Sequence, residues 1–300
     1  MRDNAHVLKG FSVSVRTLEQ LNSVVDYNCQ NNERSFVRVY VDSDLFQREP
    51  EVCSLCQKAG EICPETEWIL SLPAILRGFD RDFLAEISKT VRTPGLFSGV
   101  MTGSLEGLGY FLEQNYSGKL YADADFYLWN SDAAALWEKV LCAGTLPLEL
   151  RAGEQRALLQ KSSLPWEKIV YGRLPMMVTA NCVAQTAGNC RKNAPGRPNT
   201  DILWLRDRMG KEFPVLLNCR HCFNVIYNNV PLSLHRELSQ WRDKAVLRLQ
   251  FTVENGPETA ECLDFFLRRC GKGDAREKDR ASAAPPFSEY TTGHDKRGVQ

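Results

Sequence analysis

Short runs of apolar residues alternate with longer amphipathic segments along most of the chain. The amphipathic segments, such as 17–27, 80–91 and 256–269, carry apolar residues at three- and four-residue spacing, which predicts α-helices. The apolar runs predict β-strands, and they fall at residues 11–15, 36–42, 67–73, 95–101, 118–123, 145–150, 168–178 and 245–251. Eight such strand–helix steps in about 250 residues match the usual size of a closed (β/α)8 barrel of the TIM type.

An open doubly wound α/β sheet is the alternative architecture. Such a sheet usually places a glycine-rich phosphate loop directly after its first strand. Here the run 11–15 continues into "RTLEQ", which contains no glycine. The barrel is therefore the favoured fold class.

The seventh strand–helix step departs from this pattern. Residues 179–244 separate the last two apolar runs, where the other steps have a single helix. They include a polar, Gly- and Pro-containing stretch at 186–201 and a predicted hairpin at 202–217 that turns near Met209 and Gly210. We expect one barrel domain, 1–270, that includes this cysteine-rich insertion, followed by a flexible linker and tail at 271–300.

The insertion holds four of the eleven cysteines, namely Cys182, Cys190, Cys219 and Cys222. The N-terminus shows no signal-peptide pattern, and no apolar run approaches the roughly 18 residues that span a bilayer. We therefore expect a cytoplasmic protein without membrane partners, in which thiols stay reduced. In that compartment a disulfide framework is disfavoured, and metal binding gains weight.

The four insertion cysteines have spacings that suit a soft metal. Four sulfurs fit a structural zinc ion or an iron–sulfur cluster, and the spacing does not decide between them. The alternative is that they are small buried apolar residues, which we prefer for Cys29, Cys142, Cys262 and Cys270. His221 lies between two better ligands, so we expect it to be solvated or hydrogen-bonded.

A second cysteine group occurs in "CSLCQKAGEIC", after the second predicted strand. Cys53, Cys56 and Cys63 form a candidate second metal site that lacks one ligand. Isolated C-x-x-C matches are common, so buried thiols remain the alternative here as well.

Polar residues at the ends of predicted strands are the candidates for chemistry at the barrel mouth. Among Asp42, Asp123, Asp125, Glu149 and Arg173, we take Asp123, Glu149 and Arg173 as catalytic candidates. The alternative is that such residues cap the following helices. The formal net charge is zero, which argues against a stand-alone nucleic-acid binder, and no serine- or zinc-protease motif is present.

Several longer stretches resemble one known family. "VYGRLPMMVTANC", "LRDRMGKEFPV", "CRHCFNVIYNNVPLSL", "GHDKRGV", "SVRTLEQL", "VYVDSDLF" and "YADADFYLWN" are similar to peptidase family U-32, the collagenase-like peptidases. More narrowly, they resemble the C-terminal barrel region of the long members, which carry an extra collagenase-like domain. Long members have a further barrel upstream, which implies such a barrel, in the same or another chain, as a partner.

The resemblance implies two kinds of activity. The family name implies a peptidase, a hydrolase acting on peptides. Related members take part in oxygen-independent hydroxylation, some on ribosomal RNA or the tRNA wobble uridine and some in ubiquinone biosynthesis. They hold a [4Fe–4S] cluster through four cysteines after a late barrel strand, a role that would fall here to Cys182, Cys190, Cys219 and Cys222.

From the sequence we thus expect an iron–sulfur barrel, or a fragment of a two-barrel enzyme, that acts in the hydroxylation of RNA bases. A collagenase-like peptidase and a non-catalytic binding module stapled by zinc are the alternatives. The spacing of the cysteines differs from that of the small hydroxylation proteins. The resemblance therefore implies a cluster-binding region as a whole rather than a match of each cysteine.

Overall fold

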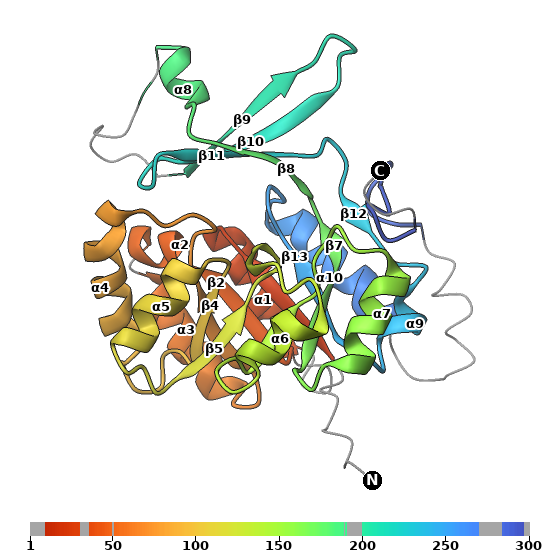
Figure 1. Cartoon of the computed structure of the whole chain (residues 1–300). Coiled ribbons are helices and arrows are strands. Elements are labelled where there is room, and N and C mark those ends of the chain that lie inside the picture. The colour runs from red at the N-terminus through yellow and green to blue at the C-terminus, as the bar shows by residue number, and fades with distance from the viewer. Residues whose placement is uncertain are drawn as a thin grey trace.

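Eight parallel strands close into a barrel, with helices around its outside (Figure 1). The computed structural model describes residues 10–30, 36–49, 51–188, 190, 200–269 and 284–296. The barrel strands follow one another in the order β1 (Phe11–Val15), β2 (Arg38–Asp42), β3 (Glu67–Ser71), β4 (Gly99–Thr102), β5 (Lys119–Ala122), β6 (Ala143–Thr145), β7 (Trp166–Gly172) and β13 (Val246–Gln250). The pairing of β6 with β7 completes the ring, which confirms the (β/α)8 barrel.

Helices follow the strands as expected for this fold. They are α1 (Leu18–Gln30), α2 (Ser43–Arg48), α3 (Glu51–Ile62), α4 (Arg81–Thr90), α5 (Leu105–Glu113), α6 (Ser131–Trp137), α7 (Ala152–Lys161), α9 (Leu238–Trp241) and α10 (Gly256–Arg269), with short 3-10 turns η2 (Gly78–Asp80) and η3 (Ala124–Phe126). Within the described residues, none of the helices combines the length and the apolar character needed to cross a bilayer.

Alternation along each strand separates two layers of side chains. In β1, Val13 and Val15 belong to the large apolar core that includes the inner faces of the helices. A smaller apolar cluster joins residues of neighbouring barrel strands, and it consists of Tyr40, Ile69, Met101, Tyr121 and Ala143. Burial of both layers stabilises the closed barrel.

Charged side chains of alternating sign form a continuous series of ion pairs in the barrel. Arg38 and Glu167 lie 2.7 Å apart, and both are almost completely buried. Glu167 also lies 3.6 Å from the fully buried Arg248. The whole series runs Lys119, Glu67, Arg38, Glu167, Arg248 and Asp123. Each buried guanidinium thus has a carboxylate on either side, which offsets its desolvation.

A second, antiparallel sheet lies over the carboxyl ends of the barrel strands (top of Figure 1). Its order is β8 (Pro175–Thr179), β11 (Phe223–Tyr227), β10 (Glu212–Asn218) and β9 (Thr200–Arg206), and the short helix α8 (Val183–Thr186) follows β8. The hairpin of β9 and β10 turns at Gly210, as expected from the sequence. We call this sheet the cover sheet.

The predicted seventh strand, 168–178, is in fact two strands in two sheets. Gly172 ends β7 with a φ of 145°, and a Cβ there would lie 2.5 Å from the carbonyl oxygen of Gln250. Only glycine allows this close approach, which lets the chain leave the barrel and enter β8. The excursion therefore begins at Pro175 rather than at residue 179, and β12 (Leu232–Ser233) returns the chain to β7.

The sixth predicted strand is also shorter than expected. We predicted a strand over 145–150, but β6 ends at Thr145, and Glu149 lies in the loop that follows. Pro147 lacks an amide hydrogen and cannot extend a ladder of strand hydrogen bonds, which accounts for the early end.

The described part of the C-terminal tail, 284–296, packs against the barrel. The carboxylate of Asp295 lies 2.6 Å from the buried ammonium group of Lys168, and Thr291 pairs with Leu232. A buried lysine needs a counter-charge, which this tail provides. Most of the predicted linker, which runs from 271 to about 286, lies outside the described residues.

Candidate functional site

The two faces of the cover sheet have different neighbours. Leu216, Phe223, Val225 and Tyr227 form an apolar cluster, and three of these four residues also line the cavity at the barrel mouth. The opposite face carries Val215 and Leu217, which pack against α8 and against two of the insertion cysteines. One sheet thus separates the barrel mouth from the cysteine region.

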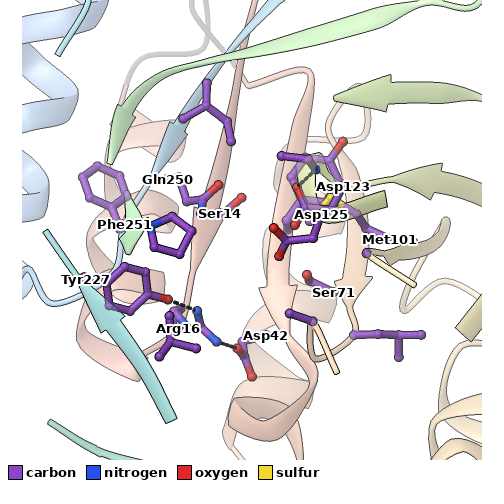
Figure 2. A pocket seen from close by; sticks show the side chains of 18 of the residues that line it. Ser14, Arg16, Asp42, Ser71, Met101, Asp123, Asp125, Tyr227, Gln250 and Phe251 are labelled. Carbon is purple, nitrogen blue, oxygen red and sulfur yellow. Dashed lines mark hydrogen bonds and ion pairs between the residues drawn. The ribbon is translucent and has the colours of Figure 1, made fainter. Parts of the chain in front are cut away.

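The barrel mouth contains a cavity of about 90 Å³ between the strand ends and the cover sheet (Figure 2). Polar side chains come mainly from the ends of several barrel strands, and apolar ones come from both the barrel and the cover sheet. The polar lining consists of Ser14, Arg16, Tyr40, Asp42, Ser71, Asp123, Asp125, Tyr227 and Gln250. This position, at the carboxyl ends of the strands, is where barrel enzymes hold their active sites.

Arg16 links the barrel to the cover sheet at this cavity. Its guanidinium donates a hydrogen bond of 2.9 Å to the hydroxyl of Tyr227 and lies 3.1 Å from the carboxylate of Asp42 (Figure 2). Asp42 also caps α2 by accepting hydrogen bonds from the amides of Asp44 and Leu45. Asp42 therefore both caps a helix and lies at the barrel mouth.

Asp123, a predicted catalytic residue, lies at the cavity but is already paired. Its carboxylate is 2.6 Å from the guanidinium of Arg248 and accepts a hydrogen bond from the amide of Ala124. This carboxylate is therefore already engaged by two partners.

Asp125 differs from Asp123 in having no hydrogen bond or ion pair with any described residue. Burial first, and then the negative charges of Asp123 and Glu149, raise the pKa of Asp125 to about 7, against the opposing effect of Arg248 and Arg16. A carboxyl that titrates near neutral pH in a cavity is suited to proton transfer. The sequence places Asp125 at a strand end, but it does not show which of two neighbouring aspartates is paired.

The other two predicted catalytic residues do not line the cavity. Glu149 lies close enough to affect the charge of Asp125. Arg173 follows β7, and its guanidinium donates hydrogen bonds to the backbone carbonyls of Asn228 and Asn229. Arg173 therefore ties the segment that enters the cover sheet, before β8, to the segment that leaves it, after β11.

The four insertion cysteines line a second cavity, of about 130 Å³, beside the cover sheet. Cys182 precedes α8, Cys190 follows it, and Cys219 and Cys222 bound the turn between β10 and β11. The remaining walls include Ala184, Leu217 and Phe223, and Phe223 lines the mouth cavity as well. The fold thus brings together, in one apolar hollow, the cysteines that sequence spacing selected.

The turn from Cys219 to Cys222 is fixed to the barrel by His221. This side chain is fully buried, and its ring nitrogens lie 2.9 Å from Asp80 and 3.2 Å from Asp44. Its ring also meets that of Phe83 edge-on, with centroids 4.8 Å apart. Burial alone would lower the pKa of His221, but the hydrogen bonds and charges of Asp44 and Asp80 outweigh burial and raise it.

His221 confirms the expectation of a hydrogen-bonded histidine, but its partners could not be read from the sequence. Asp44 and Asp80 lie 177 and 141 residues away along the chain. Cys222 completes the turn with a φ of 50°, a left-handed conformation that is unfavourable for residues other than glycine.

The donor set of this cysteine cavity, four thiols, is of the kind that binds iron–sulfur clusters. Within the described residues, no three Cys, His, Asp or Glu side chains are grouped closely enough to hold a single metal ion. A mononuclear zinc site needs all its sulfurs about 2.3 Å from one ion. A cluster binds each cysteine at a separate iron and so accepts sulfurs that are farther apart. Cys182, Cys190, Cys219 and Cys222 would be its ligands.

The candidate second metal site falls on α3, at the boundary of the apolar core. Cys56 is fully buried in that core, and burial raises the pKa of its thiol to about 12. Cys63 is also buried, close to Cys29, and burial raises the pKa of its thiol too. Thiolates bind metals, so these raised pKa values favour the buried-thiol interpretation over the second site.

Comparisons with known proteins find only distant structural similarity. No protein-family model and no curated protein matches the chain. A solved U32 peptidase is 9% identical, with a TM-score of 0.49, and the alignment covers 85% of this chain and 97% of that one. A GH18 chitinase from Cycas revoluta is 9% identical, with a TM-score of 0.38 and coverages of 91% and 99%. The spore cortex-lytic enzyme SleL of Bacillus cereus is 11% identical, with a TM-score of 0.38 and coverages of 81% and 71%. Such low identities do not identify a family.

Proposed function

We propose that this chain is an iron–sulfur barrel protein that takes part in the oxygen-independent hydroxylation of RNA bases. It would act alone or as one barrel of a two-barrel enzyme, with a family barrel as its partner. The observation that carries the proposal is the cavity lined by Cys182, Cys190, Cys219 and Cys222. The resemblance of the sequence to the U-32 family gives the class of reaction.

The two cavities would have separate tasks. The cluster, when bound, supplies one-electron transfer. Phe223 forms part of the wall of both cavities, so a substrate in the mouth would lie one side chain away from the cluster cavity. The cover sheet lies over the mouth and would limit the access of water to a bound substrate, and Arg16, bonded to Asp42 and Tyr227, links the sheet to the barrel.

Asp125 is the residue of the mouth best suited to move a proton. Its pKa of about 7 allows it to accept or release a proton at neutral pH. Asp123 is less suited to this role, because its carboxylate is already paired with Arg248 at 2.6 Å. Our sequence-based choice of Asp123 as a catalytic candidate thus gives way to Asp125 in this proposal.

Mass spectrometry of nucleosides from cellular RNA tests the function. Deletion of the gene should remove a nucleoside that is heavier than its parent by one oxygen atom, and the wild-type gene should restore it. A Cys219→Ala, Cys222→Ala variant should fail to restore it, whereas Cys142→Ser, which changes an exposed cysteine outside the cavity, should succeed.

Two outcomes would reject the hydroxylation proposal. One is that all hydroxylated nucleosides persist after deletion. The other is that purified protein cleaves gelatin and loses this activity in Glu149→Gln, which would favour the collagenase-like peptidase.

A further inference from the structure

The C-terminal stretch "GHDKRGV", residues 293–299, has no role in the proposed function so far, and the structure describes its part 293–296. The side chain of Asp295 points into the protein, where its carboxylate lies 2.6 Å from the ammonium group of Lys168. Lys168 belongs to β7 and is only 3% exposed, and its ammonium group lies 4.1 Å from the centroid of the Trp241 ring. The tail thus brings a carboxylate to a buried cation of a barrel strand.

Lys168 connects this carboxylate to the loop between β6 and α7. Its ammonium group donates a hydrogen bond to the side-chain oxygen of Gln155. The side-chain nitrogen of Gln155 donates to the backbone carbonyls of Pro147 and Leu150, at 3.0 and 2.9 Å. A lysine ammonium group can only donate, so it holds the oxygen of the Gln155 amide towards itself and the nitrogen towards the loop.

The same tail residue also holds the other end of this loop. The backbone carbonyl of Asp295 accepts a hydrogen bond of 2.8 Å from the amide of Ala152, the first residue of α7. The first amides of a helix have no partner within the helix, and Asp295 satisfies one of them. The loop 146–151 is therefore tied to Asp295 directly at its end and through Lys168 and Gln155 along its length.

This loop forms part of the wall of the barrel mouth. Leu148 and Ile169 line the mouth cavity, and both also line a small cavity of about 10 Å³ whose walls include Asp295. The tail thus lies one layer of side chains behind the mouth. Glu149, the next residue of the loop, contributes to the raised pKa of Asp125. A shift of the loop would therefore change both the shape of the mouth and the charge around Asp125.

We propose that Asp295 is a positioning residue of the barrel mouth, and that the tail 284–296 is a strap that completes the mouth. Acting through Lys168 and Gln155, Asp295 holds the loop 146–151 where a substrate in the mouth would meet it. Asp295 does not line the mouth cavity itself. The inference rests on the proposed function only in taking the mouth as the substrate site, and it does not depend on the cysteine cavity.

The alternative is that Asp295 and Lys168 merely stabilise the folded chain. A buried ion pair that serves stability alone can often be replaced by two apolar residues without loss of stability. A chain of hydrogen bonds that positions a loop cannot be replaced in this way, because the apolar residues neither donate nor accept. The two roles therefore differ in what an apolar pair restores.

Amide hydrogen exchange of the full chain, purified without oxygen, tests the position of the loop. Asp295→Asn keeps the size and the backbone carbonyl but removes the charge, and exchange in peptides that cover 146–152 should become about tenfold faster, with β1 and β2 unchanged. Asp295→Glu keeps the charge and should exchange more slowly than Asp295→Asn. Lys296→Gln, which removes the neighbouring ion pair of the same tail with Glu237, should leave exchange of the loop unchanged.

A double variant separates positioning from stability. Lys168→Met with Asp295→Leu should recover the free energy of unfolding that Asp295→Asn loses, measured by urea denaturation. Exchange of 146–152 should stay fast in this variant, because methionine cannot donate a hydrogen bond to Gln155. In cells that carry either variant in place of the deleted gene, the hydroxylated nucleoside should reappear about tenfold more slowly than with the wild-type gene.

Several results would overturn this inference. These are unchanged exchange of 146–152 in Asp295→Asn, faster exchange throughout the barrel in that variant, and slow exchange in the double variant. A normal rate of nucleoside formation despite fast exchange of the loop would also overturn it. Persistence of all hydroxylated nucleosides after deletion of the gene would instead reject the proposed function, and the exchange measurements would still decide whether Asp295 positions the loop.

Discussion

The barrel and the cover sheet differ in how their polar groups are paired. Inside the barrel, Arg38 and Arg248 are buried, and each lies between two carboxylates. The cover sheet buries few charges, but it gathers four thiols in one cavity, and none of them is in a disulfide. Within the charge series of the barrel, each buried guanidinium thus has carboxylate neighbours, whereas the cover sheet presents thiols that would suit an added group.

The two regions meet through a small number of polar contacts. Tyr227 accepts a hydrogen bond from Arg16, and His221 lies between Asp44 and Asp80. We therefore expect the buried ion pairs of the barrel to separate only when the whole barrel unfolds. The cover sheet, in contrast, should be able to open locally while the barrel stays folded.

The largest effect should come from the charge series in the barrel. Glu167→Gln removes the carboxylate shared by Arg38 and Arg248 and leaves two buried guanidinium groups poorly compensated. We expect the free energy of unfolding to fall by about 3–5 kcal/mol, measured by urea denaturation. Glu113→Gln, at an exposed ion pair with Arg81, should change it by less than about 1 kcal/mol. Equal effects of the two changes would mean that the buried series does not stabilise the barrel.

The next effect should be local to the cover sheet. His221→Asn removes the imidazole between Asp44 and Asp80, which should weaken the attachment of the cysteine turn by about 2 kcal/mol. Amide hydrogen exchange of residues 219–222 should accelerate by roughly thirtyfold, while exchange in β1 and β2 stays unchanged. Met209→Ala, in the exposed turn of the other hairpin, should leave both regions unaffected. Faster exchange throughout the barrel would show that the two regions unfold together.

A smaller, pH-dependent effect should arise at Asp125. The pKa of this group is raised in the folded protein to about 7, so folding favours its protonated form. The contribution of Asp125 to the stability of the wild-type protein should therefore be greatest below the unfolded pKa of about 3.9. This contribution should decline as the pH rises towards 7. Asp125→Asn removes this titration, so the variant should gain about 1–3 kcal/mol relative to wild type between pH 4 and pH 7.

Urea denaturation at several pH values measures this difference. The exposed Asp132→Asn should show no such trend. A difference between Asp125→Asn and wild type that is constant with pH would contradict the raised pKa.

The smallest effect should be found at Cys222, where backbone and ligand roles can be separated. Its left-handed backbone, with a φ of 50°, favours glycine, so Cys222→Gly should change the stability of the metal-free protein by no more than about 1 kcal/mol. The same variant should bind much less iron, as measured by metal analysis. A variant that keeps its iron would remove Cys222 from the proposed ligand set.

The sequence predicted the barrel because each strand and helix has a local signal of its own. It was less informative where contacts between two distant segments determine where a strand ends or which side chains pair. The split of the seventh strand at Gly172 depends on the close approach of Gln250, and the partners of His221 come from two other barrel loops.

For the site, the pattern of cysteines identified the lining of one cavity, since cysteines in polar loops stand out by themselves. The distinction between Asp123 and Asp125 could not be predicted, because it depends on which carboxylate Arg248 reaches. The packing of 284–296 on the barrel could not be predicted for a similar reason, because the tail has no periodic pattern and its contacts, such as that of Asp295 with the buried Lys168, are with residues distant in the sequence.

The most direct test of the account is the metal content and visible spectrum of the protein purified without oxygen. We predict a brown protein with about four irons and matching sulfide per chain, and loss of both in the Cys219→Ala, Cys222→Ala variant. A colourless protein that contains one zinc, or iron that is retained in this variant, would contradict the assignment of the cysteine cavity to an iron–sulfur cluster.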